Sequence, residues 1–158
     1  MVTTFYKDLR AARAAEALVR DVLASHTSGI TYELVGDEKE YFHKGDIKAT
    51  NADGSVFFIE VKDDSRIWET RNVLCEDAVF YEERQNLEPG NMHSDYEVYC
   101  VVSQHERKLY FIDFKKLQAN YKKGFYKEMI HPEQTSYTYL CQLWQIKKWG
   151  AYLGAIKY

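Results

Sequence analysis

The sequence of 158 residues has only two prolines and eight glycines, and no stretch of it resembles a linker or a low-complexity segment. Hydrophobic residues make up 46% and aromatic residues 15%, which excludes a disordered chain. No apolar run approaches the roughly 20 residues of a membrane-spanning helix. Met1 leads into a charged segment rather than the apolar core of a signal peptide. We therefore expect residues 1–158 to form one domain of a cytoplasmic protein with no membrane partner.

Clustered cysteine is also lacking. The three cysteines, Cys75, Cys100 and Cys141, lie far apart and form no C-x-x-C pair, which argues against a disulfide framework or a zinc knuckle. We expect reduced thiols in the core. The histidines show no ligand spacing, and the sequence has neither a glycine-rich phosphate loop nor a nucleophile elbow. These absences argue against zinc chemistry, nucleotide-binding loops and serine hydrolases.

Charge is unevenly distributed, although the net value is only −3. Acidic residues outnumber basic ones before Lys108, and basic residues outnumber acidic ones from there onward. Basic and aromatic side chains also alternate through residues 121–127. Such a segment can follow a nucleic-acid backbone, but a solvated face with anchoring rings is the more common explanation. Both interpretations stay open.

The order of helix and strand signals predicts a mixed fold, α/β or α+β. A first helix should begin at Thr3 or Thr4 and end near Ser25. Strands are expected at 32–35, 46–50, 56–62, 96–103, 108–114 and 136–141, shorter helices at 115–122 and 143–149, and a partly helical segment at 68–84.

The strand expected at 56–62 carries charges where a central strand is usually apolar. Strand alternation places Phe58, Glu60 and Lys62 on one face, with Phe57, Ile59 and Val61 on the other. Charged groups are seldom buried unless they are paired or bind a ligand. A simple Glu–Lys pair at the end of a strand remains an alternative.

Asp46 begins the preceding strand, and a hairpin would bring it toward Glu60. Direct opposition of residues 46 and 60 requires a loop with an odd number of residues or a bulge, because a two-residue turn would place Glu60 on the wrong face. Two adjacent carboxylates repel each other unless a cation lies between them. Their hard oxygen atoms suit Mg²⁺ or Mn²⁺. Alternatively, Asp46 simply starts a strand after a glycine turn.

The first helix contains a third polar anomaly. Phe5, Leu9, Ala12, Glu16, Val19 and Leu23 follow one helical face, and Glu16 interrupts this otherwise apolar stripe. A glutamate directed into the core needs a partner, which Lys62 or a metal could supply. A position at the edge of the stripe, within reach of water, would leave Glu16 outside any site.

Glu16, Gly45-Asp46 and Glu60-Val61-Lys62 occur in an order that resembles the PD-(D/E)XK, or restriction-endonuclease-like, nuclease superfamily. The resemblance covers about the first 115 residues and is closest to small phage or mobile-element nucleases and Holliday-junction resolvases. Segments 70–76 and 94–96 also look like pieces downstream of that core. Gly45 stands where the family name has proline, and Arg71 where a glycine is expected. The resemblance implies a three-layer α-β-α core with a mixed central sheet.

The activity that the resemblance implies is Mg²⁺- or Mn²⁺-dependent hydrolysis of DNA by an endonuclease. Asp46, Glu60 and the Val61 carbonyl would hold the cation, which activates water and polarises the phosphate. Lys62 would position that water and offset developing charge. Glu16 would orient Lys62 or contribute to a second metal site. The residues expected to contact the substrate are Lys48, Arg66, Arg71 and Asn72.

Two other classes of protein fit the same sequence. One is a nucleic-acid-binding or partner-binding module that keeps the fold without catalysis. The other is an unrelated α+β protein with a superficial E-x-K pattern. Cutting of a symmetric duplex or junction would favour a homodimer.

Overall fold

The computed structural model describes residues 2–36 and 44–158, and it shows a mixed α/β fold with two β-sheets. Sheet A has six strands and is mixed, because β3 and β6 run parallel while every other neighbouring pair is antiparallel. Its strands, in spatial order, are β1 (Thr31–Leu34), β2 (Ile47–Thr50), β3 (Val56–Asp63), β6 (Val98–Ser103), β7 (Lys108–Asp113) and β10 (Tyr152–Lys157). The predicted fold class and mixed central sheet are confirmed.

Sheet B is a four-stranded antiparallel sheet that the sequence analysis does not anticipate. Its strands, in spatial order, are β5 (Asn86–Pro89), β4 (Asn72–Tyr81), β9 (Gln134–Gln142) and β8 (Phe125–Ile130). The expectation of a partly helical segment at 68–84 is largely wrong, since only α2 (Ile67–Thr70) is helical there. Val73, Cys75 and Val79 are buried, and a register shift between Glu76 and Ala78 interrupts the two-residue period. That irregularity hides the strand pattern.

The longest helix is close to its predicted bounds, whereas the other helices are short. They are α1 (Val2–His26), α2, α3 (Phe114–Asn120) and α4 (Leu143–Lys148), with 3-10 turns η2 (Asn91–His93) and η3 (Tyr121–Lys123). Gly150, with φ +70°, follows α4 as predicted, since glycine readily adopts this left-handed conformation.

Two hydrophobic clusters lie on opposite faces of sheet A. On one face, Val19 and Leu23 of α1 pack with Ile47 and Ile59 of sheet A. On the other face, residues of β6 and β7 pack against α3, α4 and sheet B. The three cysteines are free and buried, as predicted. Sheet A is therefore covered on both sides, by α1 on one and by helices and sheet B on the other.

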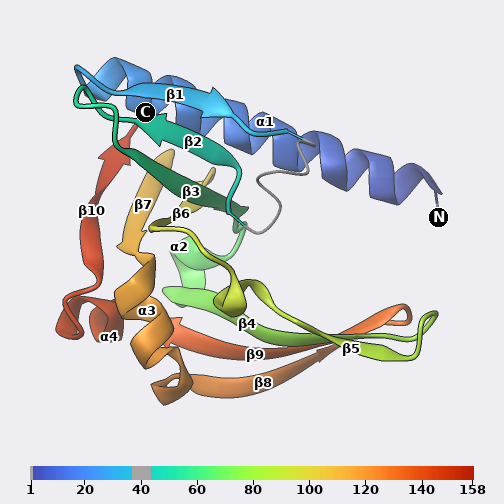
Figure 1. Ribbon diagram of the computed structural model, residues 1–158. Helices are drawn as coiled ribbons and strands as arrows, with labels where there is room; N and C mark the ends of the chain where they lie inside the picture. The colour runs from blue at the N-terminus through green and yellow to red at the C-terminus, as the bar shows by residue number, and fades with distance from the viewer. Residues whose placement is uncertain (1, 37–43) are drawn as a thin grey trace.

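The N-terminal half of α1 extends beyond sheet A (Figure 1). This explains why the predicted apolar stripe is only half correct. Leu9 and Ala12 are exposed, while Val19 and Leu23 are buried. The side chain of Phe5 lies outside the described side chains. The far end of sheet B projects in the same direction as this half of α1, and the end of β3 points toward that side of the molecule (Figure 1). No helix in the described part of the chain is long and apolar enough to cross a membrane.

Candidate active site

The hairpin of β2 and β3 brings Asp46 opposite Glu60. Ile47 pairs with Ile59 and Thr50 with Val56, so that residues 51–55 form a loop with an odd number of residues. Counting this register on by one residue brings Asp46 level with Glu60, although the regular ladder ends at Ile47 and the Asp46 N–H donates to the Ile59 carbonyl. The predicted alternation is also confirmed, because Phe58 packs in the cluster facing sheet B and Ile59 in the cluster beneath α1.

Asp46 is fixed in position by its own backbone and by β3. Its N–H donates to the carbonyl of Ile59 at 2.9 Å, and its carbonyl accepts from the N–H of Val35 at 2.9 Å. The Asp46 carboxylate accepts a hydrogen bond from the Val61 N–H at 2.8 Å. A strand turns the N–H and carbonyl of one residue toward the same edge, so the Val61 carbonyl faces the side on which Asp46 lies.

The residue before Asp46 cannot be proline in this conformation. Gly45 has φ +122°, whereas the proline ring fixes φ near −65°. A Cβ atom at Gly45 would also approach the Ile59 carbonyl oxygen to 3.0 Å. The glycine thus lets the chain pass close to β3 and present Asp46 to Val61. Arg71 likewise stands at a position that favours glycine, with φ 56° at the end of α2.

Glu16 of α1 joins this pair of carboxylates. Hydrogen bonds link Glu16 to Asp46 and Asp46 to Glu60, and the charges of Glu16 and Lys62 both act on Glu60. Glu16 is half-buried, as are Asp46 and Glu60, while Lys62 is exposed. Four side chains, from α1, from the residue before β2 and from β3, therefore meet in one cluster.

The carboxylates of this cluster hold protons more tightly than free carboxylates do. Burial raises the pKa of Glu60 to about 8, and the negative charge of Asp46 adds to this effect. Burial also raises the pKa of Asp46, although the hydrogen bond from Val61 opposes that shift. Hydrogen bonds between carboxyl groups require such protons.

We expect the metal-free protein to lose stability as the pH rises from about 5 to 8. The folded state retains the Glu60 proton up to about pH 8, whereas the unfolded chain releases it near 4.5. The stabilisation is therefore complete below pH 4.5 and is lost as the pH rises through 8. The free energy of unfolding should fall by at most about 1.4 kcal/mol per pH unit.

Urea denaturation at several pH values measures this dependence. Glu60→Gln should flatten it, whereas Glu33→Gln, at an exposed position of β1, should leave it unchanged. An equally steep decline in the Glu60→Gln protein would show that Glu60 is not the titrating group.

Lys62 also lines a cleft of about 500 Å³ between the end of β3 and sheet B. Arg66 and Asn72, two of the residues expected to contact the substrate, line the same cleft. Arg71 is not among its lining residues, because its guanidinium binds Glu106 at 2.8 Å and the Tyr110 hydroxyl at 3.0 Å. Lys48 lies opposite Phe58 in the hairpin, on the same face as Glu60.

Two core tyrosines lie beside the cluster. Tyr96 and Tyr99 are almost fully buried. Burial raises the pKa of both hydroxyls, and the charge of Glu60 contributes to each shift. They thus also form apolar surroundings for the Glu60 carboxylate. Their proximity to Glu60 depends on the parallel pairing of β3 with β6, which no local sequence pattern indicates.

The donor chemistry of the cluster fits a hard divalent cation. Asp46, Glu60 and the Val61 carbonyl offer oxygen atoms alone, which suits Mg²⁺ or Mn²⁺ and does not suit zinc. Among the described residues, no group of three or more His, Cys, Asp or Glu side chains is already arranged as a metal site. The hydrogen-bonded carboxylates would therefore have to release protons and move slightly to coordinate a cation.

The chain was compared with protein-family models, with curated proteins and with solved structures. No family model matches it, and neither of the other comparisons finds a protein with significant similarity.

Proposed function

We propose that this protein is a metal-dependent endonuclease that hydrolyses DNA phosphodiester bonds. Asp46 and Glu60 would hold Mg²⁺ or Mn²⁺, and Lys62 would act on the attacking water. The observation that supports this most strongly is the meeting of Glu16, Asp46, Glu60 and Lys62, which come from three separate elements.

Each side chain of the cluster has a distinct role in the proposed reaction. A bound divalent cation supplies Lewis acidity, which lowers the pKa of water and polarises the phosphate. The Asp46 carboxylate is oriented by the Val61 N–H and is also hydrogen-bonded to Glu60. Lys62 is exposed and lines the cleft, so its ammonium can donate to water and to a phosphate oxygen. Glu16 positions Asp46 through their hydrogen bond.

The resemblance to the PD-(D/E)XK superfamily supports the same proposal. The chain order of Glu16, Asp46 and Glu60-Val61-Lys62 is the order on which that resemblance rests, and the carboxylates lie on a mixed sheet covered on both faces. The φ of Gly45 gives a physical reason for the missing proline.

The direct test is a cleavage assay on linear, branched and flapped DNA. Product should form with Mg²⁺ or Mn²⁺ and not with EDTA. If the protein binds DNA but cuts none of these substrates with either metal, a non-catalytic binding module replaces the nuclease proposal.

We expect Glu16→Gln to reduce cleavage roughly tenfold or more while leaving the fold intact. Groups that orient metal ligands typically contribute factors of this size. The amide is nearly isosteric but lacks the charge that helps to hold a cation near Asp46. Cleavage rates over a range of Mg²⁺ concentrations should show that the variant needs more metal. Glu33→Gln serves as the control, and equal rates for the two variants would remove Glu16 from the site.

A further inference from the structure

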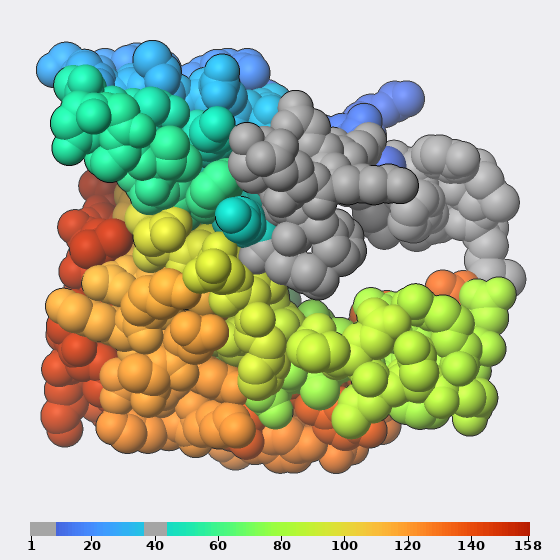
Figure 2. Space-filling model, viewed as in Figure 1, coloured from blue at the N-terminus to red at the C-terminus, as the bar shows by residue number. Residues whose placement is uncertain are grey.

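Lys62 belongs both to the carboxylate cluster and to the lining of the cleft, so the cleft adjoins the proposed site. One wall is the chain from Lys62 to Arg66, and the floor is the surface of sheet B formed by β4, β8 and β9. That surface lies opposite the hydrophobic core, because Val73, Cys75 and Cys141 face the core while Leu74 and Leu140 line the cleft. In Figure 2 the β4–β5 end of sheet B (yellow-green) projects away from the body formed by β7 and α3.

The lining of the cleft combines apolar and cationic groups. Leu74, Met129 and Leu140 offer apolar surface on sheet B, and Lys62, Arg66 and Lys127 contribute positive charges. Acidic residues line the cleft as well, and Arg66 lies 3.9 Å from the Glu69 carboxylate. Two of the acidic residues also accept hydrogen bonds within the protein. Asp63 accepts a hydrogen bond from Gln104 at 2.7 Å, and Asp64 accepts one from the Arg66 N–H at 2.8 Å. Glu76 also lines the cleft.

The size of the cleft limits what can enter it. A volume of about 500 Å³ lies within the range of sites that hold small ligands, about 300–1,000 Å³. A nucleotide or two of an unpaired strand is of this size, whereas a base-paired duplex is far larger. Proteins bind single strands by combining cations that follow the phosphates with rings on which the bases stack. The lining here provides the cations and the ring of His131, and its leucines and methionine add aliphatic surface that a base can cover.

Resting on the proposed nuclease function, we propose that this cleft binds an unpaired DNA strand whose backbone passes from Lys127 to Lys62. The preferred substrate is then single-stranded DNA or the unpaired arm of a branched DNA, in preference to a continuous duplex. Lys127 is a binding residue in this assignment, and it belongs to the basic and aromatic run at residues 121–127.

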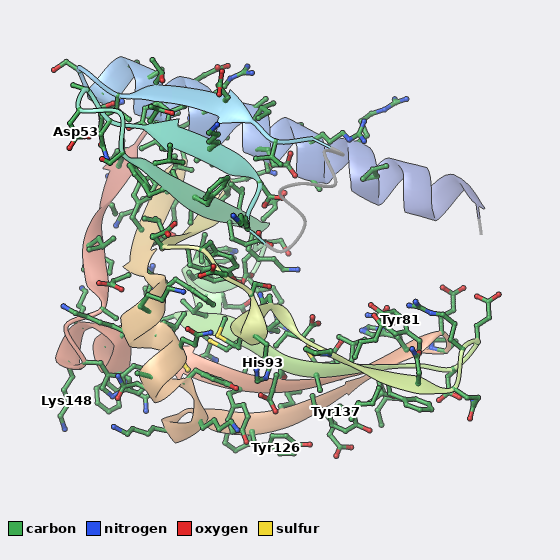
Figure 3. The ribbon with its side chains drawn as sticks, in the orientation of Figure 1. Asp53, Tyr81, His93, Tyr126, Tyr137 and Lys148 are labelled. Atoms are coloured by element: carbon green, nitrogen blue, oxygen red, sulfur yellow. The ribbon has the colours of Figure 1, made fainter. Side chains whose placement is uncertain are left out.

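Binding and its salt dependence test the cleft separately from catalysis. Fluorescence anisotropy in EDTA should show tighter binding of an oligothymidine strand than of a hairpin duplex. Lys127→Ala should weaken strand binding severalfold and reduce the slope of log K against log salt by about 0.7, the value expected for one lost phosphate contact on a single strand. Lys148→Ala is the matched control, since Figure 3 shows Lys148 at the α4 end of the molecule, and it is exposed.

The outcomes separate the two proposals. The cleft assignment is overturned if the Lys127→Ala and Lys148→Ala proteins bind the single strand equally well. It is also overturned if the wild-type protein binds duplex and single strand with equal affinity. Either result counts even if the protein cuts DNA. Selective loss in the Lys127→Ala protein supports the assignment even if no substrate is cut with Mg²⁺ or Mn²⁺, in which case the nuclease proposal fails instead. Circular dichroism should show that both variants remain folded, because both lysines are exposed.

Discussion

Lys62→Ala should lower the turnover of DNA cleavage by at least about a hundredfold. The ammonium is proposed to act on the attacking water and on the charge that develops at the phosphate, and removal of one such donor typically has an effect of this size. Asp46 and Glu60 remain in place, so Mg²⁺ should still bind. DNA affinity should change much less than turnover, because several cationic side chains share the attraction to phosphate.

Single-turnover rates at saturating enzyme, together with anisotropy measurements, separate these two effects. Lys62 is exposed, so its truncation should not affect folding. Lys148→Ala provides the control for loss of a positive charge elsewhere. A Lys62→Ala protein that cuts DNA at the normal rate would contradict the assigned role and favour the binding-module alternative.

Asp46→Asn should abolish cleavage and weaken Mg²⁺ binding by about a hundredfold or more. The amide oxygen can still accept the hydrogen bond from Val61, so the hairpin should keep its structure. Without metal, the variant should be at least as stable as the wild type at pH 8, because the negative charge next to Glu60 is gone. The loss of function would then arise from the missing ligand rather than from unfolding.

Thermal unfolding with and without Mg²⁺ measures this difference, since a cation that binds only the folded state raises Tm. Asp53→Asn is the matched control, because Asp53 is an exposed aspartate in the loop of the same hairpin (Figure 3). Mg²⁺ should raise the Tm of the Asp53→Asn protein and leave that of the Asp46→Asn protein unchanged. Equal Mg²⁺ responses in the two variants would exclude Asp46 as a ligand.

The candidate site could be anticipated because its residues break local patterns. Glu16 interrupts an apolar helical stripe and Glu60 an apolar strand, and the odd loop at 51–55 fixes their hairpin partner. Each of these signals spans only a few residues. The sequence does not indicate that tyrosines lie near Glu60, because their proximity depends on the pairing of β3 with β6. Arg71, which was expected to contact the substrate, has two long-range partners, Glu106 and Tyr110, that no local pattern indicates.

The fold was predictable where elements follow one another closely along the chain. The hairpins of β2 with β3 and β6 with β7 have short loops and an unbroken register. Sheet B was missed because β4 pairs with β9, more than fifty residues later, and its alternation is broken at Asp77. The strand β8 has mostly exposed side chains, so it lacks a buried face that a pattern could reveal. The cleft is formed largely by sheet B and was therefore also missed.

Anomalous diffraction from a crystal soaked in Mn²⁺ at about pH 8 checks whether Asp46 and Glu60 share a divalent cation. The pKa of Glu60 is about 8, so this carboxyl gives up its proton to a cation more readily at this pH than at lower pH. We expect an anomalous peak between the two carboxylates, roughly 2.1 Å from an oxygen of each, the spacing of small divalent cations. A saturating soak that gives no peak there, while the site is accessible in the lattice, would contradict that expectation.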